Sequence, residues 1–162
     1  MAAPLRAPTV SKKPTPSVSK PAVCEERNGS WQIEYQTGPE PLTVSDISMK
    51  QQVYIFGCEE RQLIFDNAVS SIEIVNSKGM QVQCKGMVPS VPIDKTDGCL
   101  VYISWEGRDV QFVTSKSSEM NVAFPEAAGS DDYVEKPIPE QFVHKIMDDL
   151  SISSDVSDLY SH

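Results

Sequence analysis

The chain has 162 residues, a formal net charge of −9 and 40% hydrophobic residues. This length supports one domain of about 120 residues with flanking tails. The excess of acidic residues argues against nucleic acid or an anionic membrane surface as the main partner, and no apolar run approaches the ~20 residues that a transmembrane helix needs.

Residues 1–21 have the composition of a disordered arm. They contain five prolines and four basic residues and no acidic residue, a mixture that does not bury enough apolar surface to fold. The segment also lacks the apolar stretch of a secretory signal. A proline-rich arm of this kind would suit a passive scaffold that engages an SH3-like partner.

Residues 22–50 are predicted to open a β-fold. Apolar side chains alternate in two short stretches, Trp31, Ile33 and Tyr35, then Leu42, Val44 and Ile47. A period of two is the pattern of a strand with one buried face. We therefore expect an opening strand and an incomplete first coil, which together cover the first open edge of the sheets.

From residue 44 onward, apolar residues recur with a period of nineteen. Four columns keep this step: Val44, Leu63, Val82, Val101 and Met120; Val53, Ile72, Val91 and Val110; Ile55, Ile74, Ile93 and Phe112; and Phe65, Cys84, Ile103 and Val122. A fixed period of this length is typical of a solenoid, and the spacing of two within each repeat indicates strands. The sequence therefore predicts an all-β fold, a parallel β-helix with coils of about nineteen residues, in which Met120 points inward.

Small and polar residues recur between these columns, where the chain is predicted to turn a corner. The corner columns comprise Glu60, Gly79, Gly98 and Ser117; Cys58, Ser77, Thr96 and Ser115; and Glu59, Lys78, Asp97 and Lys116. The charges in the last column alternate in sign. This column is either a solvated, self-neutralising corner or a device against slippage between coils, and exposed pairs of this kind contribute only about 0–1 kcal/mol each.

The repeat ends after Phe124. A turn-forming run follows at 125–132, and residues 133–139 are predicted to form a hairpin that closes the last edge, in their own subunit or in a partner's. Residues 144–162 mix serine with aspartate, and this composition predicts a flexible acidic tail.

Nothing in the sequence assembles a catalytic or metal site. The two histidines, His144 and His162, lie beyond the repeat, and neither a nucleophile triad nor a phosphate-binding glycine loop nor metal-ligand spacing is present. The four cysteines have no metal or redox spacing and fit a reducing cytosol. We interpret the chain as a cytoplasmic binding protein without a cofactor, and not as an enzyme.

Several motifs resemble one known family. They are residues 52–55, 75–78, 88–98, 115–122 and 137–142, with the runs Lys-Thr-Asp-Gly and Ser-Ser-Glu-Met-Asn as the most specific. Over residues 22–143 the chain resembles the C-terminal actin-binding domain of cyclase-associated proteins. The compact form, with only a short stub before the β-helix, is similar to versions found in some protists. Functions of the family's other parts, such as adenylyl cyclase binding, cofilin-filament disassembly and profilin recruitment, are not carried over.

The resemblance implies a right-handed parallel β-helix that forms a homodimer by exchanging a C-terminal hairpin, here about residues 121–142. The residues that would hold the dimer are Val122, Phe124, Tyr133, Val134, Pro137, Ile138, Pro139 and Phe142. The resemblance also implies binding of actin monomers, with the ADP form favoured, and either nucleotide exchange or sequestration of the monomer during filament turnover.

The family motif places the actin contacts at one corner. Carried over residue by residue, they are Lys95, Thr96, Asp97, Lys116, Ser117, Ser118, Glu119 and Asn121, with Lys78 as a weaker member. Because actin is itself acidic, the lysines of this acidic chain would have to act locally, through charge-assisted contacts.

An alternative from another class is a GTPase-activating protein of the tubulin cofactor C type, a related β-helix that uses an arginine finger. Such a role needs an arginine displayed on a sheet face. Arg61 and Arg108 are both predicted at corners, without a matching motif around them.

Overall fold

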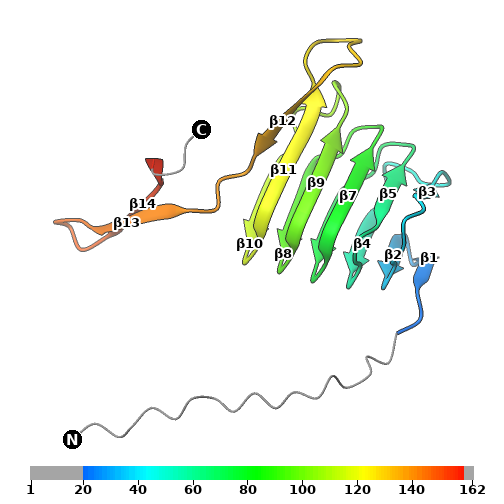
Figure 1. The fold of residues 1–162 in the computed structure, drawn as a ribbon, viewed down its shortest axis with the longest axis horizontal. Helices are drawn as coiled ribbons and strands as arrows, with labels where there is room; N and C mark the ends of the chain where they lie inside the picture. Colours follow the sequence, from blue (N-terminus) through cyan, green and yellow to red (C-terminus); the bar gives the residue numbers. More distant parts are fainter. Residues whose placement is uncertain (1–19, 159–162) are drawn as a thin grey trace, which may run out of the picture.

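The computed structural model describes residues 20–158, which form fourteen β-strands and no α-helix (Figure 1). One six-stranded sheet, sheet A, comprises in spatial order β1 (Val23–Arg27), β2 (Ser30–Glu34), β4 (Gln52–Phe56), β6 (Ser71–Val75), β8 (Ser90–Asp94) and β10 (Gln111–Ser115). The other, sheet B, comprises β12 (Tyr133–Pro137), β11 (Ser118–Pro125), β9 (Asp97–Ile103), β7 (Lys78–Cys84), β5 (Gln62–Phe65) and β3 (Leu42–Val44). The chain alternates between the two sheets, and consecutive coils pair in parallel from β2 to β11. The predicted all-β parallel β-helix is confirmed.

The core lies between the two sheets because every second side chain of each strand points inward. Ile33, Ile55, Ile74 and Ile93 form one continuous column, and each is at most 1% exposed. Met120 is 4% exposed, as its predicted inward position requires. One coil supplies too few apolar side chains to offset the ordering of its backbone, so the coils stabilise one another as a stack.

The period of nineteen is correct for the central coils only. Leu63 pairs with Val82 and Val82 with Val101, each nineteen residues apart. At the ends, however, Leu42 pairs with Leu63 and Met120 with Cys99, each twenty-one apart. The physical reason is loop length, because seven residues (45–51 and 104–110) connect the strands in the first and last coils, whereas five (66–70 and 85–89) do so in the middle.

The predicted columns are therefore wrong by two residues at their ends. The terminal members affected are Val44, Val110, Phe112, Met120 and Val122. Met120 and Val122 still point into the core because a shift of two preserves the face of a strand. At the corners the same shift of two residues gives each residue of the last coil a different neighbour from the predicted one.

The two ends of the solenoid differ. At the first end the predicted opening strand is β2, and β1, which the sequence pattern did not indicate, lies antiparallel to it. At the last end β12 folds back antiparallel on β11 of the same chain, and the Ile138 amide donates to the Met120 carbonyl at 2.8 Å. The segment predicted for exchange thus closes its own sheet B.

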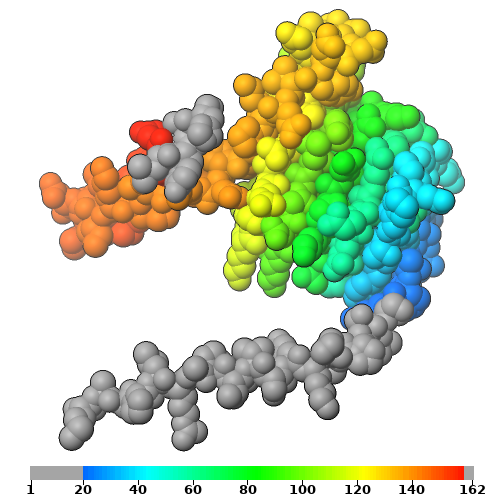
Figure 2. Space-filling view, viewed as in Figure 1, coloured from blue at the N-terminus to red at the C-terminus, as the bar shows by residue number. Residues whose placement is uncertain are grey.

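Beyond this point the chain forms a second hairpin, β13 (Phe142–Ile146) with β14 (Ile152–Val156). It stands away from the solenoid (Figures 1 and 2). Residues 144–156 were expected to belong to a flexible tail without secondary structure, and in the structure they form most of this hairpin. No helix long and apolar enough to cross a membrane occurs among residues 20–158. The predicted arm and the end of the predicted tail, residues 1–19 and 159–162, lie outside the described residues.

Candidate functional site

The corner between the sheets is built from two columns of residues with left-handed backbone. The first comprises Tyr35, Gly57, Asn76, Lys95 and Lys116, and the second comprises Gly38, Glu60, Gly79, Gly98 and Glu119, all with positive φ. Left-handed backbone lets the chain turn sharply from one sheet into the other and suits glycine and asparagine best. Lys95 and Lys116, both at φ 49°, are thus in a conformation that lysine rarely adopts.

Between these two columns runs a ladder of hydroxyl groups. The amides of Cys58, Ser77 and Thr96 each donate to the hydroxyl one coil further on, those of Ser77 (3.2 Å), Thr96 (3.5 Å) and Ser117 (3.1 Å). Each hydroxyl in turn donates to the carbonyl two residues before it, at 2.9–3.1 Å. The ladder satisfies buried backbone groups that the sheets cannot pair. Its last member is Ser117, whereas the uniform period predicted Ser115.

The charged column at this corner also differs from its predicted form. Lys78 pairs with Asp97 as expected, but Asp97 pairs next with Ser118, whose hydroxyl donates to its carboxylate at 2.6 Å. Lys116 instead lies beside Lys95, one strand spacing away, because the Lys95 amide donates to the carbonyl of Ser115. The longer last coil therefore places two cations side by side instead of opposite charges.

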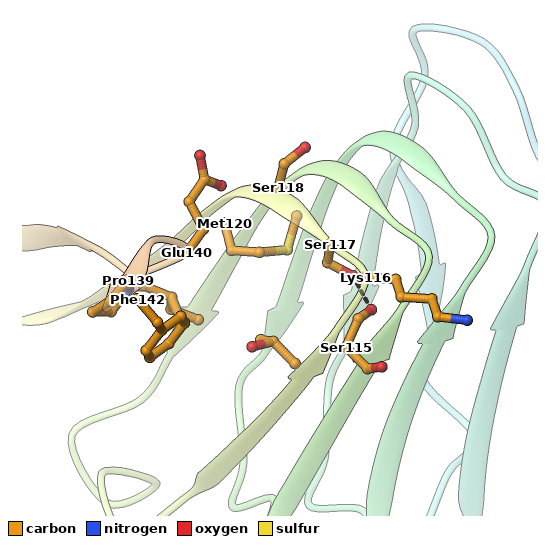
Figure 3. A pocket seen from close by; sticks show the side chains of 10 residues that line it. Ser115, Lys116, Ser117, Ser118, Met120, Pro139, Glu140 and Phe142 are labelled. Atoms are coloured by element: carbon orange, nitrogen blue, oxygen red, sulfur yellow. Dashed lines mark hydrogen bonds between the residues drawn. The ribbon is translucent and has the colours of Figure 1, made fainter. Parts of the chain in front are cut away.

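A hollow of about 330 Å³ adjoins this corner on the last coil. Figure 3 shows Ser115, Lys116 and Ser117 on one side and Glu140 and Phe142 on the other. The Glu140 carboxylate accepts a hydrogen bond from the backbone amide of Glu119 at 2.7 Å. The outgoing segment is thereby held against the corner.

The structure places the predicted contact residues along this corner, with different exposure. Lys78, Lys95, Asp97, Lys116 and Glu119 are exposed, and Ser117, Ser118 and Asn121 are half-buried. The exception is Thr96, which is 1% exposed and belongs to the hydroxyl ladder. Its side chain cannot contact a partner, so that prediction is wrong on accessibility. Glu140 was missed, because only folding brings the segment after the second sheet back to the corner.

The predicted dimer residues fall into two groups. Val122, Phe124, Val134 and Ile138 are half-buried, and three of these pack against the end of the core. Tyr133, Pro137, Pro139 and Phe142 are exposed, although the Tyr133 ring contacts that of Tyr102 edge-on with centroids 6.1 Å apart. The segment thus lies on its own solenoid up to Ile138 and leaves it at Phe142.

The apolar surface available for a partner lies mainly on the second hairpin, of which the predicted dimer residues included only Phe142. One face of it carries four apolar side chains that are 48–79% exposed, Phe142, Ile146, Ile152 and Val156. On either side of the turn at 147–151 these apolar residues are four apart, with the polar residues His144 and Ser154 between them on the same face.

The two arginines considered for a finger are engaged, and of the four free cysteines only Cys24 is exposed. The Arg61 guanidinium donates to the carbonyl of Thr37 at 2.6 Å, and that of Arg108 stacks 3.4 Å from the ring centroid of Trp105. Neither arginine is presented as a free finger. Burial raises the pKa of the Cys99 thiol to about 12, which removes it as a nucleophile at neutral pH. Within residues 20–158, no group of three or more His, Cys, Asp or Glu side chains could hold a metal ion.

These features define a β-solenoid protein with a polar corner and an incompletely covered last coil. The comparisons with known proteins agree with this class. The sequence profile of the family described as "Adenylate cyclase associated (CAP) C terminal" matches residues 20–62 and 57–159. The chain therefore belongs to this family.

Individual relatives support the assignment. The adenylyl cyclase-associated protein of Dictyostelium discoideum is 40% identical over 143 residues, which are 76% of this chain and 31% of that protein. The human adenylyl cyclase-associated protein 2 is 38% identical over 151 residues, 82% of this chain and 31% of that protein. The chain thus spans about a third of the length of these curated relatives. The crystal structure of the cyclase-associated protein from Cryptosporidium parvum is similar with a TM-score of 0.71 and 30% identity, over 85% of this chain and 96% of that one.

Proposed function

We propose that this chain binds actin monomers through the corner of its last two coils. The observation that carries the proposal is the adjacent, exposed pair Lys95 and Lys116 beside the hollow of the last coil. Membership of the cyclase-associated protein family and the motif runs at this corner support it. An actin monomer binder acts in the cytoplasm, where it contributes to filament turnover without catalysing a reaction itself.

The electrostatics of the chain favour local contacts over general attraction. With a net charge of −9 the chain as a whole repels another acidic protein. The two lysines form a small cationic patch at the corner, where a carboxylate of the partner can accept charge-assisted hydrogen bonds. Asp97 and Glu119 flank the lysines and give the corner a mixed pattern that selects orientation.

The favoured nucleotide state and the outcome of binding are part of the same proposal. We expect tighter binding to ADP-actin than to ATP-actin, followed by either faster nucleotide exchange or sequestration of the monomer. Both outcomes begin with the same contact. They separate in one assay, because an exchange factor raises the release rate of a fluorescent nucleotide and a sequestering protein does not.

The chain is further proposed to act as a homodimer in which the hairpin β13–β14 of one chain covers the last coil of the other. The hairpin offers an exposed apolar face, and the last coil offers Phe112, Val122 and Phe124, which are only half-buried. Covering both removes apolar surface from water at roughly 25 cal/mol per Å². The exchanged segment then begins near Phe142, beyond most of the range that the motif resemblance indicated.

The actin contact is tested by titrating the chain into labelled ADP-actin monomers at physiological salt. The variant Lys95→Glu/Lys116→Glu should bind at least tenfold more weakly. The matched control Arg27→Glu/Lys50→Glu makes the same change in net charge at the first coil and should lose far less. Equal losses in both variants would show that only net charge matters and would refute the assignment of the corner.

The dimer is tested separately by sedimentation. The variant Ile146→Asp/Ile152→Asp places charges on the apolar face of the hairpin and should sediment as a folded monomer, with a thermal midpoint that is lower because the last coil loses its cover. Met49→Asp, at a side chain that is 68% exposed on the first coil, is the control. If the wild-type chain sediments as a monomer at tens of micromolar, the proposed dimer is refuted, and the proposed actin contact is unaffected.

A further inference from the structure

The outer face of sheet A has an aromatic cluster where strands β2 and β4 end. The Tyr54 and Phe56 rings on β4 are stacked with centroids 6.0 Å apart, and the Phe56 ring meets that of Tyr35 edge-on at 5.8 Å. Tyr35, Tyr54 and Phe56 are all half-buried, with part of each side chain facing solvent. Contiguous half-exposed aromatic rings on a sheet are a typical platform for a partner segment.

Carboxylates surround this cluster. Glu34 pairs with Phe56 on one side, Glu73 pairs with Tyr54 on the other, and Asp94 follows one strand further on. Burial, followed by the charges of Glu73 and Glu34, raises the pKa of Tyr54. Among the strands of sheet A the one basic residue is Arg27, which pairs with Glu25. The face is therefore aromatic and acidic.

One cation already occupies the edge of this platform. The Lys20 ammonium lies 5.1 Å from the ring centroid of Tyr35 and donates to its hydroxyl at 3.2 Å. This is the geometry of a cation–π contact. Because Val23 pairs with Glu34, the chain enters β1 at the end of sheet A where the aromatic cluster lies. The residues before Lys20 thus start beside the platform.

We propose that residues 1–19 of the same chain bind across the outer face of sheet A, with their prolines on the aromatic cluster and their basic residues at the surrounding carboxylates. The sequence of this segment contains Pro4, Pro8, Pro14 and Pro16, with Arg6, Lys12 and Lys13, and no acidic residue. Its composition is complementary to the face in both respects. Proline-rich segments bind aromatic surfaces at low entropic cost because their extended helix is preformed.

The reach of the segment is sufficient. Strands lie about 4.8 Å apart, so the distance from β2 to β8 is roughly 14 Å. An extended proline-type helix rises about 3.1 Å per residue, so Lys13, seven residues before Lys20, can lie roughly 22 Å from it. The pair Lys12–Lys13 can therefore reach Asp94 while residues 14–19 cross Tyr54 and Phe56. The outer face of sheet B also has apolar side chains, Ile64, Leu100 and Tyr102 beside Gln62, Gln81 and Gln83, but no carboxylate stands among these positions to bind the basic residues.

Paramagnetic relaxation in the full chain tests this docking. A nitroxide is attached to the variant Ser11→Cys/Cys24→Ser; the other three cysteines, Cys58, Cys84 and Cys99, are buried. We expect the amide signals of Tyr54 and Glu73 to lose at least half of their intensity, whereas those of Gln62 and Gln83 on sheet B change little. The further variant Lys12→Glu/Lys13→Glu should restore the lost intensity. Equal broadening of both faces, or none, would overturn the proposal.

A mixed sample separates binding within one chain from binding between chains. Unlabelled chain carrying the nitroxide is mixed with ¹⁵N-labelled chain without it. Broadening of Tyr54 and Glu73 in the mixture as strong as in the single species would assign the face to the segment of a second copy, which also overturns the proposal as stated. The test does not depend on actin, so its outcome is independent of the proposed function.

Discussion

Lys95 and Lys116 are expected to lower the stability of the fold that presents them. Both have φ of 49°, and the residue before them in the same column, Asn76, has the same φ. The left-handed conformation costs an ordinary L-residue about 1–2 kcal/mol, whereas asparagine tolerates it much better. Replacing each lysine by asparagine should therefore recover roughly 0.5–1 kcal/mol, or about 1–2 kcal/mol for the double variant.

The two lysines also repel each other across one strand spacing, so the double substitution removes this cost as well. For a domain of this size each kcal/mol raises the thermal midpoint by roughly 2–4 °C. Lys95→Asn/Lys116→Asn should therefore melt about 2–8 °C above the wild type in a calorimeter, while its affinity for ADP-actin falls. Backbone strain that is relieved at the expense of binding is the expected behaviour of a functional site.

The control is Lys50→Asn, at an exposed lysine without positive φ. Its free energy of unfolding should change by no more than about 0.5 kcal/mol, as for a neutral surface substitution, so its thermal midpoint should stay close to that of the wild type. A double variant that melts at or below the wild-type temperature would refute the reasoning from backbone strain. A double variant that is stabilised but still binds actin as tightly as the wild type would refute only the claim that these lysines contact actin.

Three further outcomes follow from the corner and the core. Ser77→Ala removes a hydroxyl that is 3% exposed and should cost about 1–3 kcal/mol in chemical denaturation, whereas Ser115→Ala should be nearly neutral. Gly86→Ala should destabilise more than Gly129→Ala, because a Cβ at Gly86 would meet the backbone nitrogen of Ala68 at 2.2 Å, which cannot move aside, and one at Gly129 meets nothing within 4 Å. The free energy of unfolding should fall as pH rises from 9 toward 12, by up to about 1.4 kcal/mol per pH unit from Cys99 alone, because burial raises the pKa of its thiol from the ordinary 9.0 to about 12 in the folded state. The sign follows because the folded state retains this proton, and Cys99→Ala should reduce the slope.

The central coils could be predicted from the sequence because burial on a strand imposes a period of two and stacking imposes a fixed coil length. Ile72 and Ile74 are fully buried, as this pattern requires. The first and last coils could not be aligned in this way. A corner loop accepts two extra residues at little cost, since it faces solvent and loop closure depends only weakly on length. The insertion at 104–110 leaves the inward face intact and so produces no break in the hydrophobic pattern.

The same insertion decides the identity of the site. With nineteen residues in the last coil, Lys116 would lie opposite Asp97 and the corner would be neutral. With twenty-one, Lys116 lies beside Lys95. The residues near Lys95 and Lys116 do not indicate whether the last coil has nineteen or twenty-one residues. The hydrogen bonds between coils show it. For this reason the prediction from the sequence placed opposite charges together.

The second hairpin was missed for a different reason. Serine and aspartate dominate residues 148–158, and the apolar face of the hairpin has only four apolar side chains, four residues apart on each strand, so it gives no clear strand alternation. An isolated hairpin is marginally stable in water. Its apolar face, with Ile146 79% exposed, therefore gains more from a partner surface than from its own chain, consistent with the proposed exchange.

Neighbouring residues of one motif have different tasks at this corner. In the run from Lys95 to Gly98, Lys95 turns the backbone and faces solvent, Thr96 is buried in the hydroxyl ladder, Asp97 is exposed and pairs with Ser118, and Gly98 turns the backbone again. Half of such a run is needed to form the corner and half is available to a partner. A motif therefore locates a binding site on a solenoid but does not identify its contacts. The alternation also explains why charge reversal of the exposed members can separate binding from folding, whereas substitutions at Thr96 or Gly98 would disturb both together.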